Sequence, residues 1–430
     1  DQQDFEKIPG APIAYWVPDT VITAFEENPR LDEIAKPRQG LATGDNKRFL
    51  RHWPEVSQDR IGFGYESRSA VRRGGEKWFP YNKGGKYQKW YGNLEFVVNW
   101  KDDGREIRNN TDDQGRQRSR PQNTDYYFKE GITWSDITSG SFGCRHSSGG
   151  FIFDVQGSSA FPDKEHLWYI LGFLNSSFVT YALYVLNPTM HYQVGNISDL
   201  PVQFPDSNRK SRIEDLVQES VGYSKRDWDS RETSWDFTQH PLAQQNADSL
   251  EAAYASWKQH ATDDFLHLQA NEEELNDLFI DLYGLENELS PCVALDDITI
   301  LEDELERDAL GELDDERDEL SDDELRARFL EDDLDDVLFK VEVPIRQFLS
   351  YGIGVMLGRY RLGHDGLHIA HPNPSGDELA PYEVPTPLSG FESNGMETFE
   401  IDDDAIVPLM CRDSPFSDDA VVRMRDIVRL

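Results

Sequence analysis

The stretch Ser67–Asn93, SRSAVRRGGEKWFPYNKGGKYQKWYGN, brings basic, aromatic and glycine residues together at high density. It holds seven lysines or arginines against one acid, Glu76, and six aromatic residues lie from Trp78 to Tyr91. Cations interleaved with aromatic rings and glycines suit the phosphates and exposed bases of a nucleic acid. The same residues read equally well as an aromatic-rich hairpin of the core with solvated lysines. We call this stretch the basic island.

The charge of the chain is distributed unevenly around this island. The 430 residues include 43 basic and 81 acidic side chains, a net charge of −38. Residues 1–150 hold 23 basic and 22 acidic residues, whereas residues 151–430 hold 20 and 59. Lysine is scarce, with 14 lysines against 29 arginines, and this composition predicts a halophile's protein with a hydrated acidic surface. The near-neutral first third is then the part expected to accept an anionic partner.

The remaining composition favours a folded protein of a reducing compartment. A chain of this length with 38% hydrophobic residues can form two or three domains with their own cores. Cys144, Cys292 and Cys411 form no CxxC pair, so neither a zinc ribbon nor a disulfide framework is expected. The uncharged run Leu167–Leu186 contains four polar residues, which favours a buried helix over a membrane span. The start lacks a signal peptide and a methionine, so we expect a fragment of a longer cytoplasmic protein.

Periodicity predicts a mixed α/β first half followed by a mainly helical region. Strands are expected at Leu94–Trp100, Gly131–Ser135, Gly149–Val155 and, as a closing strand, Ile197–Phe204. The polar segment Lys101–Arg120 is expected to be a mobile loop. Helices are expected at Ser211–Lys225, Asn246–His267, Asn271–Tyr283 and Ile345–Tyr360. Leu301–Lys340, with 19 acids and five bases, is expected to form solvated acidic helices, one of them capped by Ser321.

No self-contained catalytic motif stands out. His364, His368 and His371 lie in a segment broken by glycine and proline, so a solvated loop is favoured over a metal site. The segment Asn187-Pro188-Thr189-Met190 lacks the second proline and the aromatic residue of the NPPY motif that holds a flipped base, and it is interpreted as a helix stop. No carboxylate set suits a nuclease. The residues alone therefore predict a binding protein rather than an enzyme.

Several spaced motifs are distinctive in combination. They are Pro37-Arg-Gln-Gly-Leu-Ala-Thr-Gly-Asp-Asn46, Lys77-Trp-Phe-Pro-Tyr-Asn-Lys-Gly-Gly85, Lys89-Trp-Tyr-Gly-Asn93, Val97-Val-Asn-Trp100, Gly131-Ile-Thr-Trp-Ser135 and Ser139-Gly-Ser-Phe-Gly143. Together they resemble the region after the catalytic domain in the PglX family, the adenine-specific DNA methyltransferases of BREX phage-defence systems. That family is akin to the fused type IIG restriction-modification enzymes.

The resemblance implies a domain order and a function. Residues 1–206 would be a mixed α/β DNA target-recognition domain, 207–290 a helical connector and helical domain, 291–340 an acidic insertion and 341–430 a C-terminal helical and loop region. In the full protein, S-adenosylmethionine would methylate the N6 of an adenine, with the catalytic domain and the cofactor outside this chain. The implied partners are double-stranded DNA and other defence subunits or a phage inhibitor, but no membrane. The alternative is a protein-interaction module that binds an acidic partner or a phage inhibitor.

The candidate DNA-binding residues fall into three groups. Phosphate contacts are predicted for Arg72, Arg73, Lys77, Lys83, Lys86 and Lys89. Base-edge contacts are predicted for Arg38, Asn46, Arg118, Arg120, Gln122 and Asn123, because arginine suits guanine and an amide suits adenine. The other candidates are Gln39, Thr43, Lys47, Trp78, Tyr81 and Asn82. A structural role is the alternative for each. At high salt, stacking by Trp78, Tyr81 and Trp90 is expected to carry more of the affinity.

Overall fold

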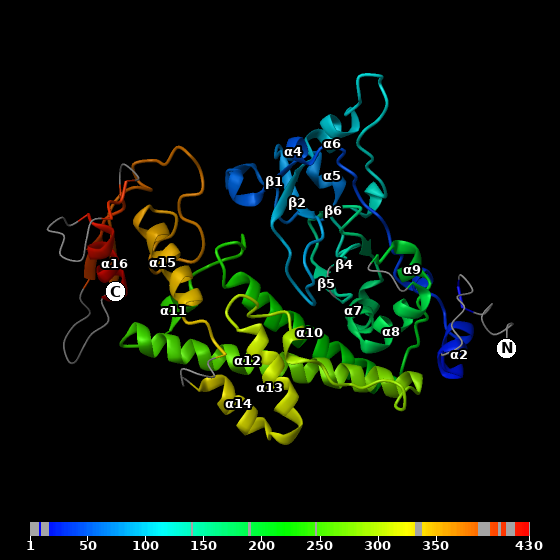
Figure 1. Cartoon of the computed structure of the whole chain (residues 1–430). Coiled ribbons are helices and arrows are strands. Elements are labelled where there is room, and N and C mark those ends of the chain that lie inside the picture. Colours follow the sequence, from blue (N-terminus) through cyan, green and yellow to red (C-terminus); the bar gives the residue numbers. More distant parts are fainter. Residues whose placement is uncertain are drawn as a thin grey trace. The chain divides into compact units, whose positions relative to one another are not determined.

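The structure is a computed structural model that describes residues 8–9, 17–138, 141–187, 191–245, 247–331, 338–385, 396–402, 406–409 and 418–429 (Figure 1). The chain forms two compact units. The first consists of Asp1–Val56, Arg60–Arg226 and Phe265–Ile300, and the second of Ser57–Asp59, Asp227–Asp264 and Leu301–Leu430. The predicted mixture of helices and strands is confirmed. The four predicted domains group the chain differently from these units and stay a prediction.

A four-stranded sheet of the first unit contains part of the basic island. Its order is β1 (Leu50–His52), β3 (Phe96–Asn99), β2 (Trp78–Asn82) and β6 (Ile152–Phe153). β2 runs antiparallel to β3, and Phe79 lies opposite Val98. All five β2 side chains are buried. The strand predicted around residues 94–100 is thus confirmed, and residues 78–82 adopt the core-hairpin alternative.

The second sheet of this unit has the order β5 (Cys144–Ser147), β4 (Gly131–Trp134) and β7 (Ser159–Ala160), all antiparallel. β4 confirms the strand predicted at Gly131–Ser135, and β6 confirms the strand predicted at Gly149–Val155. The predicted closing strand is wrong, because α9 (Val194–Ser198) occupies its start and Pro201 pairs with Arg30 only through an isolated bridge.

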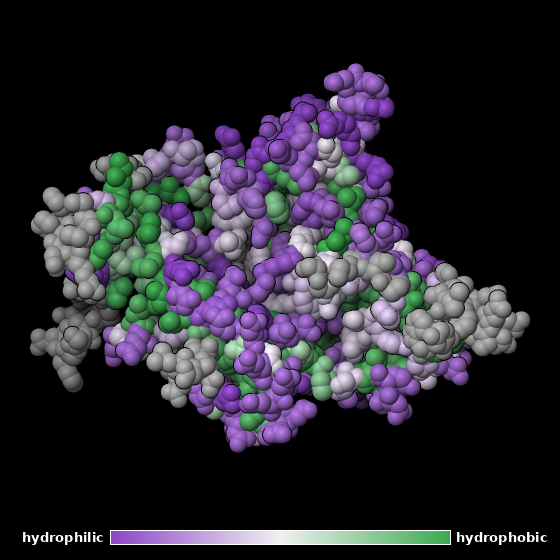
Figure 2. Space-filling view, in the orientation of Figure 1, coloured by the Kyte–Doolittle hydropathy of each residue, from purple (hydrophilic) through white to green (hydrophobic). Residues whose placement is uncertain are grey.

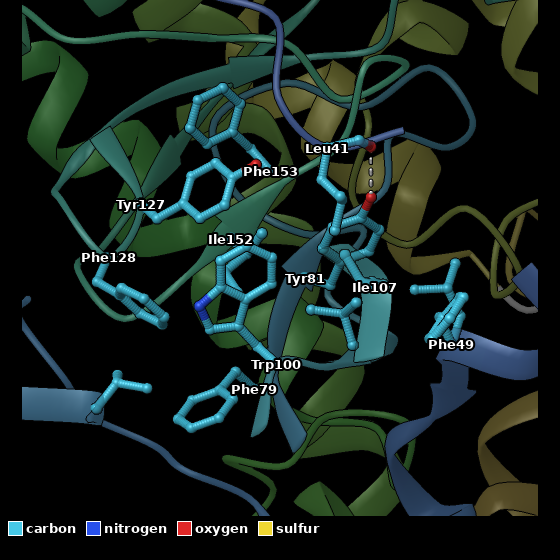
Figure 3. Packing of buried hydrophobic residues seen from close by; sticks show 13 residues of the cluster. Leu41, Phe49, Phe79, Tyr81, Trp100, Ile107, Tyr127, Phe128, Ile152 and Phe153 are labelled. Carbon is cyan, nitrogen blue, oxygen red and sulfur yellow. Dashed lines mark hydrogen bonds between the residues drawn. The ribbon is translucent and has the colours of Figure 1, made fainter. Parts of the chain in front are cut away.

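Aromatic side chains form the core beside the four-stranded sheet (Figure 3). The Trp100 and Tyr127 rings pack edge to face with their centroids 5.2 Å apart, and those of Phe79 and Phe128 do so with centroids 5.7 Å apart. Burying one such side chain contributes roughly 1.5–3 kcal/mol. The first unit also contains five shorter helices, which are α2 (Asp19–Glu27), α3 (Leu31–Ile34), α4 (Asn46–Phe49), α5 (Arg68–Val71) and α6 (Lys101–Arg108). Of these, α4 contacts β1 and α6 contacts β3.

The uncharged run is buried as predicted, but it forms two helices, α7 (Leu167–Asn175) and α8 (Ser177–Leu186), bent by 69°. The break lies at Ser176, whose hydroxyl accepts a hydrogen bond from the Val179 N–H and caps α8. Among the described residues, no single helix has the length and apolar composition needed to cross a membrane, and this bent pair meets the test only when both helices are taken together.

A long helix contributes to both units. The sequence predicts a break at Asn271, but α12 (Leu250–Tyr283) is continuous. The Asn271 amide donates to Glu219 of α10 (Ser207–Asp229) at 3.2 Å instead of capping a new helix. Buried leucines before and after the expected break continue one apolar face, so packing outweighs the local capping signal. The glycine that follows α12 has a φ of 65° and ends the helix as predicted.

The second unit is mainly helical, as predicted. Its other elements are α11 (Pro241–Gln244), α13 (Arg307–Glu316), α14 (Asp322–Leu330), α15 (Glu342–Met356), α16 (Ala420–Arg429), β8 (Tyr382–Pro385) and β9 (Met396–Phe399). The predicted Ser321 cap is confirmed by a reciprocal capping box with Glu324. Across both units, the short 3-10 helices are η1 (Trp53–Glu55), η2 (Gln58–Arg60), η3 (Thr124–Tyr126), η4 (Lys164–His166), η5 (Leu295–Asp297) and η6 (Arg317–Glu319).

Candidate nucleic-acid interface

Two loops far apart in the sequence pair along their backbones. Residues 38–47 form the first loop and residues 118–123 the second. The Arg120 N–H donates to the Ala42 carbonyl at 2.7 Å, and the Ala42 N–H donates back at 3.1 Å. The Asn123 amide reaches the Gln39 carbonyl at 2.8 Å, and the Ser119 hydroxyl donates to the Thr43 carbonyl. Most of the predicted base-reading residues therefore lie on one supported double loop, which we call the paired loops.

Gly44 permits the close approach of the paired loops. Its φ is +68°, and a Cβ placed there would lie 2.5 Å from the Arg118 carbonyl oxygen. Gly44→Ala is expected to cost about 1–3 kcal/mol of unfolding free energy and to weaken DNA binding, because the backbone strain adds to the clash. Thermal unfolding and duplex titration measure the two effects.

Gly115→Ala is the matched control for this substitution. Gly115 has a φ of +76°, but a Cβ there meets nothing within 4 Å. The control therefore carries the strain without the clash between the loops. Equal losses of duplex affinity in the two variants would show that the loop pairing does not matter for binding.

An arginine cluster lies next to the paired loops, on α5 and α6. The Arg68 guanidinium binds both oxygens of Asp103, at 2.9 and 2.6 Å, and Arg72 binds the same carboxylate at 2.6 Å. A third arginine, Arg108, donates to the Asp103 carbonyl at 2.9 Å. Although burial opposes ionisation, the hydrogen bonds from Arg68 and Arg72 lower the pKa of Asp103 below its usual value. One carboxylate thus orients an excess of positive charge.

The predicted mobile loop at residues 101–120 is partly wrong. Its first part is α6, which begins with left-handed backbone at Asp102, Asp103 and Gly104. The tertiary contacts of Asp103 stabilise this start. Residues 109–118 then form an arm that projects from the unit (Figure 1) and has a strongly hydrophilic surface (Figure 2). Within the arm, Arg116 pairs with Asp112 at 2.7 Å.

The candidate residues differ in exposure. Those with exposed side chains are Asn46, Lys47, Arg72, Arg73, Lys86, Arg118, Arg120 and Asn123. Those that are half-buried are Arg38, Gln39, Lys77, Lys83 and Gln122. Arg118 and Arg120 make no side-chain hydrogen bond or ion pair among the described residues, whereas Lys83 bonds Gln156 and lies 3.1 Å from Asp154. The candidate side chains of the paired loops and of the end of α5 are therefore more accessible to a ligand than those of β2.

The expectation that island aromatics stack on bases is wrong for this conformation. Trp78, Tyr81 and Trp90 are 8%, 0% and 1% exposed, so no base can reach their rings. The Tyr81 hydroxyl lies 2.9 Å from the Leu41 carbonyl oxygen and 2.6 Å from the Asp154 carboxylate, and burial raises the pKa of this tyrosine (Figure 3). Of these three side chains, Tyr81 thus contacts the paired loops directly, at Leu41.

Three polar candidates are also buried and have protein partners. Lys89 forms an ion pair with Glu272 of α12 at 2.6 Å, and Trp90 Nε1 donates to the other oxygen of Glu272 at 2.6 Å. The Asn82 amide donates to a serine hydroxyl, and the Thr43 hydroxyl donates to the Asn46 side chain. Burial excludes direct contact of Lys89, Asn82 and Thr43 with DNA, because their side chains do not reach the surface.

Two known proteins match most of this chain. The adenine-specific methyltransferase PglX of Lacticaseibacillus casei strain Zhang is 38% identical over 377 residues, which are 86% of this chain and 28% of that protein. The adenine-specific methyltransferase BrxX of Escherichia coli O9:H4 strain HS is 32% identical over 433 residues, which are 100% of this chain and 31% of that protein. The chain belongs to the PglX/BrxX family. It spans less than a third of the length of these relatives, and no family profile matches it.

The names of the PglX and BrxX relatives imply S-adenosylmethionine as a cofactor. Open α/β folds bind such ligands at the carboxyl ends of parallel strands, often at a glycine-rich turn that leads into a helix. Among the described residues, parallel pairing of named strands is limited to two residue pairs between β2 and β6, and each of these strands leads into a loop. The described residues therefore do not fit this cofactor.

The structure also adds residues that were not among the candidates for this PglX/BrxX-family chain. Arg68 and Arg108 orient the arginine cluster, but only their position in basic segments pointed to them. No group of three or more metal-ligating side chains lies close enough among the described residues to hold an ion. His371 pairs with Glu378 at 2.9 Å in a loop, as predicted for this segment. Residues 188–190 of the predicted helix stop lie outside the described residues.

Proposed function

We propose that this chain is the DNA-recognition part of a site-specific adenine (N6) methyltransferase of a phage-defence system. The paired loops read the edges of the bases, and α5, α6 and the arm hold the phosphates. The transfer of the methyl group from S-adenosylmethionine takes place at residues outside this chain. Other defence subunits are proposed as partners, and the cytoplasm as the location.

One observation carries this proposal. Arg118 and Arg120 extend exposed guanidinium groups from a backbone that hydrogen bonds fix against residues 38–47. An exposed guanidinium without a hydrogen bond or ion pair to the protein suits bidentate contact with guanine or phosphate. The membership of the PglX/BrxX family supports the same reading, since the relatives are named adenine-specific methyltransferases.

The intact protein with Arg118→Ala and Arg120→Ala tests the proposal. Removing each base-reading arginine is expected to weaken specific duplex binding by about 1–3 kcal/mol and to relax the methylated motif. Fluorescence anisotropy with the native motif and methylation-sensitive sequencing measure the two effects. Binding is measured at low salt and in molar KCl, because the predicted halophilic setting removes most of the electrostatic contribution.

Two further variants separate the roles of the arginines. Arg72→Ala with Arg73→Ala is expected to weaken all duplexes alike and to reduce the salt slope by about one for each phosphate that is no longer neutralised. Arg209→Ala with Arg212→Ala removes the same charge from ion pairs on α10 and serves as the control. Wild-type affinity and an unchanged motif in the Arg118/Arg120 variant would refute the proposed role of the paired loops.

A further inference from the structure

A cavity of about 460 Å³ lies in the first unit, away from the paired loops. It is enclosed by segments of α8, α12, the residues before β5 and the residues around η5. Cavities of this volume are typical of small-molecule sites. None of the candidate DNA-reading residues lines it, and Lys89 is the one candidate for phosphate contact that does.

One face of α8 forms a wall of the cavity. Ser177, Thr180, Tyr181 and Tyr184 follow one another at helical spacing and all line it. The opposite face of α8 is buried in the core, so this wall is fixed. Tyr184 is 58% exposed, which is unusual for a large aromatic side chain and leaves its ring accessible to a ligand. The wall thus presents two phenol rings and the Thr180 hydroxyl to a ligand.

The floor of the cavity is polar but already paired. The Asn175 amide accepts from the Cys144 N–H at 2.8 Å and donates to the Cys144 carbonyl at 3.0 Å. Asn276 of α12 accepts from the Ser177 N–H at 2.8 Å. By contrast, the enclosed Ser177 hydroxyl makes no hydrogen bond to the protein. The Ser177 oxygen has almost no accessible surface, so a ligand in the cavity does not reach it, whereas Thr180 on the same wall is exposed.

The charges of the cavity exclude phosphate ligands. Lys89 is the one cation among the lining residues, and its ammonium group is held by Glu272 at 2.6 Å. The other charged lining residue is an acid, Asp297. An anionic ligand would therefore meet a neutralised lysine and a carboxylate. A neutral ligand that offers a flat aromatic face and hydrogen-bonding edges matches the phenol rings and the Thr180 hydroxyl.

We propose that this cavity binds a neutral nucleobase, stacked on Tyr184 and hydrogen-bonded to Thr180. The base comes either from a free nucleoside or from a nucleic acid in which it is unpaired. This site is independent of the paired loops, so the proposed function can fail while this inference holds.

Cys292 provides a local readout in the intact protein, because it lines the cavity and its thiol is exposed. Its alkylation by N-ethylmaleimide can be followed by peptide mass spectrometry. Adenosine at ten times its dissociation constant is expected to slow alkylation about tenfold, since only the unoccupied fraction reacts. The doubly charged AMP is expected to bind at least about tenfold more weakly than adenosine.

Substitutions in the wall test the contacts. Tyr184→Ala is expected to weaken adenosine protection about tenfold, whereas Tyr184→Phe keeps the ring and the protection. Thr180→Val is expected to weaken it several-fold, with Ser211→Ala on the exposed face of α10 as the control. Loss of protection in the Ala but not the Phe variant at position 184 distinguishes stacking from a general loss of structure.

Two duplexes distinguish the sources of the base. Protection by a duplex with a bulged adenine but not by adenosine supports a base held in nucleic acid, and protection by adenosine alone supports a free nucleoside. Equal protection by bulged and fully paired duplexes would show that the nucleic acid covers Cys292 from outside, and this result overturns the proposal. No protection by either adenosine or the bulged duplex overturns it as well.

Discussion

Glu272→Gln is expected to lower the free energy of unfolding by about 3–5 kcal/mol, because it leaves the buried ammonium group of Lys89 without a countercharge. The wild-type carboxylate bonds Lys89 and Trp90, each at 2.6 Å. Burial alone would lower the pKa of Lys89, but the charge of Glu272 raises it above the usual value for lysine. The stabilisation is therefore complete at neutral pH and is lost only as the pH rises above the usual lysine range.

Guanidinium unfolding at neutral pH measures this loss. Glu274→Gln is the control on the same helix, because Glu274 pairs with Arg212 at the surface and is expected to contribute less than about 1 kcal/mol. The double variant Lys89→Met/Glu272→Gln removes both charges and is expected to recover much of the loss. A similar loss in the Glu272 and Glu274 variants would contradict a special role for the buried pair.

Arg231→Gln is the second substitution with a large expected effect, about 3–5 kcal/mol in the second unit. The guanidinium binds both oxygens of Asp227 at 2.7 and 2.9 Å and both oxygens of Glu304 at 2.8 and 3.3 Å. Glutamine would leave two buried carboxylates facing each other. Arg328→Gln, which breaks a surface pair with Glu316, is the matched control and is expected to cost less than about 1 kcal/mol.

The pKa values of the two acids in this cluster are shifted in opposite directions. Burial raises the pKa of Asp227, whereas for Glu304 the charge of Arg231 overcomes burial and lowers the pKa. The stabilisation from ionised Glu304 is present above the usual glutamate range and is lost as the pH falls. The variant gains stability on acidification, because protonation relieves the repulsion of its two acids. The difference in unfolding free energy between wild type and variant should therefore become smaller at low pH. A difference that stays constant with pH would refute this account.

Local patterns predicted the strands and helices whose residues pack by their own periodicity. β3 and α10 follow from apolar residues at strand and helix spacing, and the Ser321 cap follows from its Glu324 partner. The start of α6 could not be predicted, because it depends on the contact of Asp103 with Arg68, 35 residues away. The continuity of α12 also depends on packing against other helices rather than on its own sequence.

The sequence identified loops whose candidate side chains are mostly exposed, but it also proposed island side chains that are buried. Composition located a basic, aromatic segment, but it carries no information on which way each side chain points. The pleat of β2 places Tyr81 in the core, and a single acid on α12 withdraws Lys89 from the surface. Arg118 and Arg120 remained accessible because the backbone and the side chains of Ser119, Gln122 and Asn123 make the contacts of their loop.

Under the proposed function, the backbone pairing of residues 38–47 with residues 118–123 has a consequence for changing the target sequence. The two segments are separated by some 70 residues of scaffold, yet a change of length in one is expected to disturb the other, because Ala42 and Arg120 exchange backbone hydrogen bonds. New specificity would therefore evolve, or be grafted, by exchanging both segments together as one cassette. A graft of one segment alone would leave unmatched amides beside the Tyr81 scaffold.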